Sequence, residues 1–158
     1  MSRGSVLWAF RAPRHLLEYP ALFEPQPEGG YLITFPDFDW GISQGDAEED
    51  SRMMATALLQ TMIQKHIRHG EPLPKASRLR GRKYRLIRLP AMQAAKAELY
   101  RQFRASGLRK IDLASRMGIP KTVVDRLFDL DHHTRMNQIE AAFAALGKRL
   151  GIVVENAA

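Results

Sequence analysis

Residues 110–129 read KIDLASRMGIPKTVVDRLFD, and this stretch sets the architecture of the C-terminal half of the chain. Its apolar positions recur at three- and four-residue spacing and comprise Leu113, Met117, Val124 and Leu127. Two short helices that share such a face must cross at a tight turn. Ala114 permits their close approach, Gly118 suits the left-handed conformation that ends a helix, and Pro120 suits the first turn of the next helix. The pattern predicts a helix-turn-helix.

A helix-turn-helix reads DNA with the start and the outer face of its second helix. This placement predicts base contacts from Lys121, Thr122, Asp125 and Arg126, and phosphate contacts from Arg109, Lys110 and Arg116. Since two modules on one palindromic operator lie about 34 Å apart, we expect a homodimer or a higher oligomer. An ordinary helical hairpin that meets no nucleic acid is the alternative interpretation.

The 158 residues carry a net charge of +7 and give a pI of about 10.0, which favours an anionic partner. Nine of the 17 acidic residues lie between positions 18 and 50, where there is no Lys or Arg. These acidic residues are Glu18, Glu24, Glu28, Asp37, Asp39, Asp46, Glu48, Glu49 and Asp50. The other eight stand against all 24 Lys and Arg, so two partners of opposite charge are expected. Acidic loops that are merely solvated are the alternative.

Four strands and one long helix are predicted before position 90. The predicted strands are residues 18–24, 31–35, 41–44 and 84–89, the first two joined by the turn PQPEGG. We expect the helix to begin at Asp46, as the N-cap of a capping box with Glu49, and to end at Gly70. Its predicted core face comprises Met54, Ala55, Leu58, Leu59, Met62, Ile63 and Ile67.

A basic segment follows this helix and runs into the last strand. It contains Lys75, Arg78, Arg80, Arg82, Lys83, Arg85 and Arg88, and no acidic residue. Its first half is predicted to be a loop. This loop either contacts phosphates or stays solvated and balances the charge of the acidic region.

Further helices are predicted on both sides of the helix-turn-helix, over residues 91–106 and 135–146. Pro90 is placed to open the first, Gly107 to end it, and Thr134 to be the N-cap of the second. A DNA-binding domain of four or five helices results. We expect residues 152–154 to form a short terminal strand or a dimer contact.

The composition excludes several classes of protein and site. The chain has no Cys, so it has no disulfide, thiolate metal site or cysteine nucleophile. No apolar run reaches the roughly 18 residues of a membrane span. The stretch SVLWAF at residues 5–10 is too short for the core of a signal peptide. We therefore expect a cytoplasmic protein without a membrane segment.

The sequence suggests two kinds of metal site, but neither has a complete set of ligands. A ribonuclease-like centre with two metal ions is suggested by Asp37, Asp39, Asp46 and Glu49. Asp46 and Glu49 already have an expected capping role, however, and two aspartates in one short loop seldom complete such a centre. The histidine pairs at positions 66 and 69 and at 132 and 133 lack further ligands for zinc. We expect no enzymatic activity, no metal and no cofactor.

The motifs of the N-terminal half together resemble those of the HicB antitoxin family. They are Tyr19-Pro20, Gly29-Gly30-Tyr31, Phe35-Pro36-Asp37, Gln44-Gly45 and the acidic start of the long helix. The C-terminal half, GIPKTVVDRLFDLDHHTRMNQIEAAFAALGKRL, is similar to the helix-turn-helix of one branch of that family. The two matches cover residues 17–154. The stretch before Glu18 is a departure, because family members commonly lack it.

The resemblance implies an α+β protein. Residues 1–17 are then an N-terminal extension, residues 18–89 a toxin-binding β-α-β domain like a partial ribonuclease H fold, and residues 90–158 an all-α helix-turn-helix domain. Such antitoxins bind and block HicA, a small basic toxin that cleaves mRNA, and they repress their own operon by binding its operator.

The toxin contact is expected on the acidic region at residues 18–50 and along exposed strand edges. Its expected residues are Tyr31, Phe35, Asp37, Asp39, Gln44, Gly45 and Asp46. The alternative function is a stand-alone helix-turn-helix transcription regulator whose N-terminal domain senses a small ligand.

Overall fold

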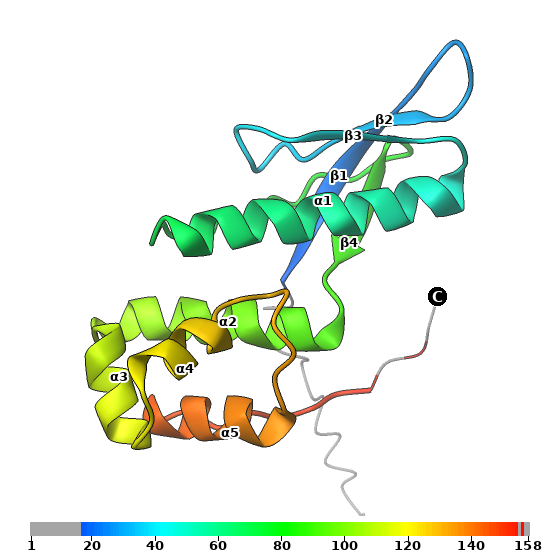
Figure 1. The fold of residues 1–158 in the computed structure, drawn as a ribbon. Coiled ribbons are helices and arrows are strands. Elements are labelled where there is room, and N and C mark those ends of the chain that lie inside the picture. The colour runs from blue at the N-terminus through cyan, green and yellow to red at the C-terminus, as the bar shows by residue number, and fades with distance from the viewer. Residues whose placement is uncertain (1–16, 155, 157–158) are drawn as a thin grey trace, which may run out of the picture.

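The computed structural model describes residues 17–154 and 156, so residues 1–16 of the expected N-terminal extension lie outside the described part. The elements are β1 (Glu18–Pro25), β2 (Tyr31–Thr34), β3 (Ile42–Gly45), α1 (Glu48–Arg68), β4 (Tyr84–Arg88), α2 (Ala91–Ser106), α3 (Lys110–Met117), α4 (Lys121–Leu127) and α5 (Met136–Ala145). The sheet and α1 form one part of the molecule, and α2 to α5 form the other (Figure 1). The mixed α+β class is confirmed.

The four strands form one antiparallel sheet in the order β3-β2-β1-β4. β1 is central and pairs with both β2 and β4, so β3 and β4 are the edges. Gly30, which ends the β1–β2 turn, has a φ of +74°, and a Cβ there would lie 2.2 Å from the carbonyl oxygen of Gly45. Only glycine fits this close approach. The expected brief third strand is therefore real and closely packed.

α1 covers one face of the sheet (Figure 1). Its buried residues include Ala55, Leu59, Met62, Ile63 and Ile67. Alternate residues of β1, namely Tyr19, Ala21 and Phe23, are buried as well. The predicted core face was wrong at Met54, which is 40% exposed. A helix on a flat sheet buries a narrower stripe than one enclosed on several sides.

The expected cap of α1 was also wrong. The helix begins at Glu48, and its N-cap is Ala47, which makes no side-chain cap bond. The backbone N–H of Asp46 instead donates to Oδ2 of Asp50 over 2.9 Å. The carboxylate that satisfies this helix start therefore comes from inside the first turn, and the side chain of Asp46 stays exposed.

Four helices make up the C-terminal half. α2 runs from Ala91 to Ser106 as predicted, with Gly107 in the left-handed conformation at its end. Thr134 was wrongly expected to cap α5, because the N-cap of that helix is Arg135. Thr134 is buried, and its hydroxyl donates to the carbonyl of His132 inside the preceding loop. Residues 152–154 form no strand and have exposed side chains, so only their role as a dimer contact stays a prediction.

Hydrogen bonds and apolar packing join the two halves. The backbone N–H of Leu130 donates to Oε1 of Gln64 on α1 over 2.6 Å, in a buried position. Gln60 donates to Asp131 over 2.7 Å, and the hydroxyl of Tyr100 donates to the carbonyl of Glu71 over 2.8 Å. The buried apolar residues of both halves belong to one continuous cluster. The expected boundary between residues 89 and 90 remains a prediction about domains.

Candidate nucleic-acid and partner-binding surfaces

The helix-turn-helix is built on a dry apolar seam. Leu113 of α3 and Val124 of α4 are fully buried, and Gly118 between them has a φ of 64°. Phe128, at the end of α4, packs against the rings of Tyr100 and Phe103 of α2 at centroid distances of 5.7 and 5.0 Å. These contacts fix α4 against the scaffold and leave its opposite face in solvent.

Of the residues expected to read bases, Lys121, Thr122 and Arg126 are exposed on α4. Asp125 is partly buried between two cations, with Nζ of Lys110 at 2.7 Å and Nζ of Lys121 at 3.0 Å. Burial acts to raise the pKa of Asp125, but the hydrogen bonds from Lys110 and Lys121 outweigh it and hold that pKa below its ordinary value. Asp125 therefore orients two lysines, and both of its carboxylate oxygens are engaged.

The arginine side chains near the helix-turn-helix differ in whether they already have a hydrogen-bond or ion-pair partner. Arg109 is highly exposed but pairs with Asp112, and this hydrogen bond is the main cause that lowers the pKa of Asp112 to about 2. Arg116 donates to the carbonyl of Ala145 over 3.3 Å. Arg126 has no side-chain partner in the part of the chain that the structure describes.

Lys96 is a residue of this region that the sequence analysis missed. It is fully buried on α2, and its ammonium donates to three backbone carbonyls: Arg126 at 3.3 Å, Asp129 at 2.6 Å and His132 at 2.5 Å. Burial lowers the pKa of Lys96, while the negative charges of Asp129 and Asp131 act to raise it. Three acceptors match the three N–H bonds of an ammonium group.

Lys96 thus ties the C-terminal end of α4 and the loop behind it to α2. A signal for it was present in the sequence, since position 96 falls between Met92 and Leu99 at helical spacing, on the inward face of α2. A lysine on a core face is rarely left without partners.

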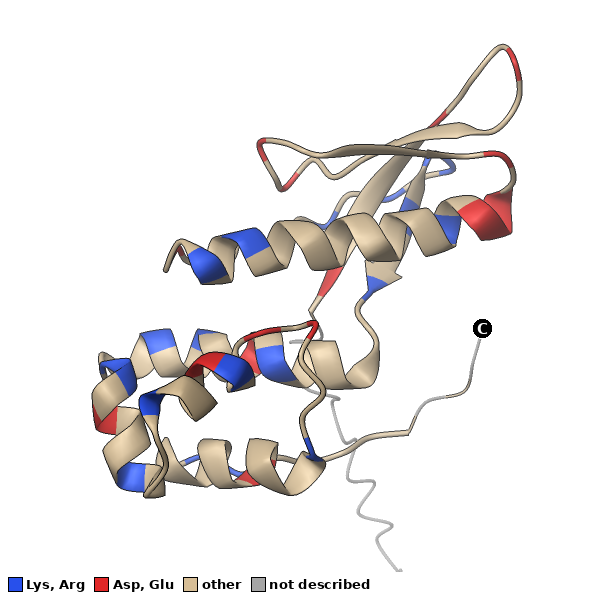
Figure 2. Cartoon of the chain, viewed as in Figure 1, with Lys and Arg blue, Asp and Glu red and all other residues tan. Residues whose placement is uncertain are grey.

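The residues expected to bind the toxin do not form one patch. Gln44 and Asp46 lie at the end of β3 that leads into α1, whereas Asp37 and Asp39 lie in the loop before β3. Figure 2 shows acidic residues in both connections of the sheet and at the start of α1. The side chains of Asp39, Gln44 and Asp46 are exposed.

The other expected toxin contacts have structural partners. Phe35 is 2% exposed and belongs to the core. Gly45 is buried against Ser51 of α1, and Tyr31 is half-buried with its ring 5.7 Å from that of Phe23. Asp37 accepts a hydrogen bond from the backbone N–H of Ser77 over 3.0 Å. The structure of the sheet half therefore requires several of these motif residues, whether or not they contact a toxin.

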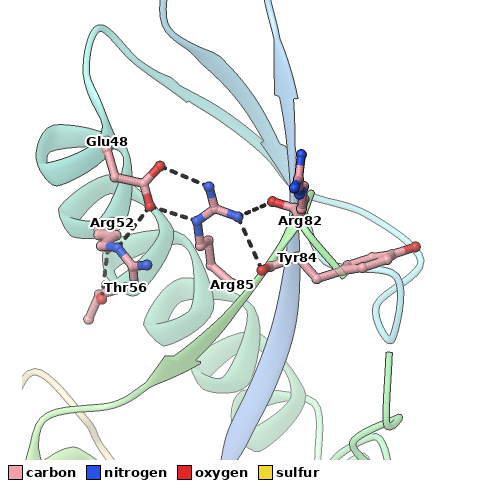
Figure 3. A network of polar contacts seen from close by, with 6 residues as sticks. All are labelled: Glu48, Arg52, Thr56, Arg82, Tyr84 and Arg85. Atoms are coloured by element: carbon pink, nitrogen blue, oxygen red, sulfur yellow. Dashed lines mark hydrogen bonds and ion pairs between the residues drawn. The ribbon is translucent and has the colours of Figure 1, made fainter. Parts of the chain in front are cut away.

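The acidic start of α1 is tied to the edge strand β4 by an ion pair that was not anticipated (Figure 3). Arg85 of β4 donates to both carboxylate oxygens of Glu48, over 2.6 and 3.1 Å, and Arg52 donates to one of them over 3.0 Å. The hydrogen bond from Arg85 is the main cause that lowers the pKa of Glu48. The negative charge of Glu48 is thus neutralised by arginines of the same chain.

The metal sites considered from the sequence find no support in the geometry. Within residues 17–154 and 156, no three His, Asp or Glu side chains gather where they could hold a metal ion. Asp37 binds the backbone of Ser77, and Nδ1 of His66 lies 3.0 Å from the carbonyl of Pro72. None of the helices in this part of the chain combines the length and the apolar character that a membrane span requires.

The comparisons with known proteins agree on one family. A family model described as HicB-like antitoxin of bacterial toxin–antitoxin systems matches residues 18–98. Antitoxin HicB 1 of Photorhabdus laumondii is 34% identical over 139 residues, 88% of each chain. Antitoxin HicB of Escherichia coli K12 is 33% identical over 138 residues, which is 87% of this chain and 99% of that one.

Antitoxin HicB of Pseudomonas fluorescens is 32% identical over 155 residues, which is 98% of this chain and 99% of that protein. So long an alignment reaches into residues 1–17, and the stretch before Glu18 therefore has a counterpart in that relative. Because the family model and these relatives match across the sheet, α1 and the helical half, the chain belongs to the HicB-like antitoxin family of bacterial toxin–antitoxin systems.

Proposed function

We propose that this antitoxin binds and neutralises a small basic HicA-type toxin and represses its own operon by binding operator DNA. The division of charge supports the proposal most directly. Acidic residues are gathered around the sheet and the start of α1, and the outer face of the helix-turn-helix carries exposed cations (Figure 2). Partners of opposite charge therefore suit the two parts of the molecule.

The toxin would dock along β3. This strand is an edge of the sheet, so one side of its backbone has no neighbouring strand among the described residues. Exposed Asp39 lies before it, and exposed Gln44 and Asp46 lie at its other end. A partner strand added to this edge would gain main-chain hydrogen bonds, and the flanking carboxylates would attract a basic toxin and set its register.

The operator would be read by α4. Arg126 and Thr122 are exposed and are the best placed to reach base edges. Lys110 and Lys121, oriented by Asp125, and Arg109 and Arg116 beside them suit phosphates. A homodimer would place two such helices about 34 Å apart on a palindrome.

Co-expression tests the toxin part of the proposal. The gene beside this one is expected to encode a very short, basic, histidine-containing protein. We expect that expression of that protein alone stops growth, that co-expression of this antitoxin restores growth, and that the two proteins co-purify. Absence of both rescue and complex would overturn the antitoxin role proposed for this pair.

A cleft of about 520 Å³ favours a second candidate function, that of a ligand-sensing regulator. It lies where Trp40 and α1 meet Asp131 of the loop behind α4, and Lys65 sits 4.0 Å from the centre of the Trp40 ring. A small ligand there would contact both halves of the chain. Operator binding without toxin rescue would favour this function.

A further inference from the structure

The loop before β4 is an exposed cationic surface that the proposed functions do not use. Residues 75–83 contain Lys75, Arg78, Arg80, Arg82 and Lys83 and no acidic residue. Within the described residues, Lys75, Arg78 and Arg80 have no acidic partner. On the helix-turn-helix, by contrast, Lys110 and Lys121 share Asp125. A smaller share of the positive charge on this loop is therefore neutralised by acidic residues than on the expected DNA-reading surface.

A groove of about 790 Å³ accompanies this loop. It is lined by Glu18, Ala76, Ser77, Arg78, Leu79, Arg80, Gly81, Tyr84 and Leu86. Two kinds of unused polar group meet there. The guanidinium groups of Arg78 and Arg80 are free of acids, and Oγ of Ser77 is buried without a hydrogen-bond partner among the described residues. A buried hydroxyl without a partner calls for an explanation.

The pleat of β4 explains why the groove is open. Arg85 points to α1, where it binds Glu48, while its neighbour Tyr84 points the opposite way (Figure 3). Tyr84 and Leu86 therefore lie on the sheet face that α1 does not cover. Leu86 is 44% exposed and Leu79 of the loop is 40% exposed, so this face of β4 is available to a partner.

We propose that this groove, which we call the β4 groove, binds the phosphodiester backbone of nucleic acid at a site separate from the helix-turn-helix. Arg78 and Arg80 can each donate paired hydrogen bonds to a phosphate. The ring of Tyr84 offers a base a surface to stack on, as in other grooves that follow a nucleic-acid strand.

A second copy of this chain is the rival occupant, because its acidic region has the complementary charge. Several of those carboxylates are already engaged, however: Glu18 by Arg88, Asp37 by Ser77 and Glu48 by Arg85. The remaining exposed acids are spread over β1, the loops of the sheet and the first turn of α1. A continuous chain of phosphates matches a row of free cations better.

The test uses the full-length protein with Lys121→Ala and Arg126→Ala, so that reading by α4 is removed from the measurement. In this background Arg78 and Arg80 are both changed to Gln. Binding to a duplex of random sequence and to a single-stranded RNA is followed by fluorescence anisotropy at several salt concentrations. We expect affinity to fall at least tenfold on one of the two probes. The slope of log K against log salt should fall by about 1 for each phosphate that the variant no longer binds.

Two further variants show whether charge at this place is the cause. The pair Arg78→Lys and Arg80→Lys keeps the charge and should retain most of the affinity. The pair Lys148→Gln and Arg149→Gln removes the same charge from the exposed segment after α5 and should change affinity less than twofold. An unchanged salt slope in the Arg78 and Arg80 variant, or an equal loss of affinity in the Lys148 and Arg149 control, would overturn the proposal.

The two nucleic-acid probes and the oligomeric state distinguish DNA, RNA and a second copy of this chain as occupants of the β4 groove. Preference for the duplex would assign the β4 groove to DNA beside the operator, and preference for the single strand would assign it to RNA. Light scattering that shows dissociation of a self-associated protein in the Gln pair, with nucleic-acid binding unchanged, would overturn the proposal in favour of a second copy. Neither result depends on whether α4 reads an operator.

Discussion

Arg126 is the residue of α4 whose cation is free in the described chain, whereas its neighbour Asp125 holds Lys110 and Lys121. An arginine so placed donates two hydrogen bonds to a guanine. We expect Arg126→Ala to weaken operator binding by about 1–3 kcal/mol, measured by fluorescence anisotropy with the operator duplex. Arg68→Ala, at the exposed end of α1, serves as the control. An equal loss of affinity for random DNA would make Arg126 a phosphate contact.

Lys96 is the residue on which the position of α4 depends. Lys96→Met would leave the carbonyls of Asp129 and His132 without their donor in a partly buried place. A buried acceptor left unpaired costs about 1–3 kcal/mol. We expect the free energy of unfolding in urea to fall by that order and operator affinity to fall with it. Toxin rescue should persist, and an operator affinity that stays at the original value would refute the positioning role.

Strand β1 is held to the loop behind α1 by Tyr19, whose hydroxyl donates to the carbonyl of Pro74 over 2.8 Å. Burial is the main cause that raises the pKa of Tyr19 from 10.0 to about 12. A folded-state pKa above the unfolded one gives stabilisation that is complete below pH 10 and is lost as the pH rises through 12. Tyr19→Phe should reduce this alkaline loss, and it should cost about 1 kcal/mol at neutral pH. Urea unfolding at a series of pH values measures both effects.

Helix α1 is anchored to β4 through Glu48 and Arg85 (Figure 3). The lowered pKa of Glu48 means that this pair stabilises the fold above the unfolded-state pKa of Glu and ceases to do so as the pH falls through the folded-state value. Glu48→Gln should therefore remove part of the acid dependence of the melting temperature. The effect is expected to be small, because the pair is partly exposed. An unaltered acid dependence would contradict this role.

At the scale of the molecule, the sheet half and the helical half share one apolar cluster. The buried bond from Leu130 to Gln64 and the contact of Tyr100 with Glu71 cross between them. We expect one cooperative unfolding transition, with far- and near-ultraviolet circular dichroism changing together. Gln64→Ala should lower its midpoint, whereas Asn137→Ala at an exposed position of α5 should change it little. Two separate transitions would show that the halves fold independently.

Local sequence rules predicted the elements well, since strands, turns and helix ends depend on neighbours along the chain. Gly107 and Gly118 end α2 and α3 as expected, because glycine adopts the left-handed conformation without steric cost. The same rules failed at Asp46 and Thr134. Both residues have side chains suited to a cap, but the carboxylate of Asp50 accepts from the backbone N–H of Asp46, and the hydroxyl of Thr134 donates back to the carbonyl of His132.

The sequence by itself determined the family, the mixed α+β class, the acidic region at residues 18–50 with the basic remainder, and the apolar seam of the helix-turn-helix. Only the tertiary structure decided which of the expected contact residues are free. It placed Phe35 in the core and gave Lys96 its three carbonyls. The physical reason is that burial, hydrogen bonds and ion pairs join residues far apart in the chain, such as Gln64 and Leu130, which are 66 positions apart and share a buried hydrogen bond. No spacing within one helix or strand encodes such a contact.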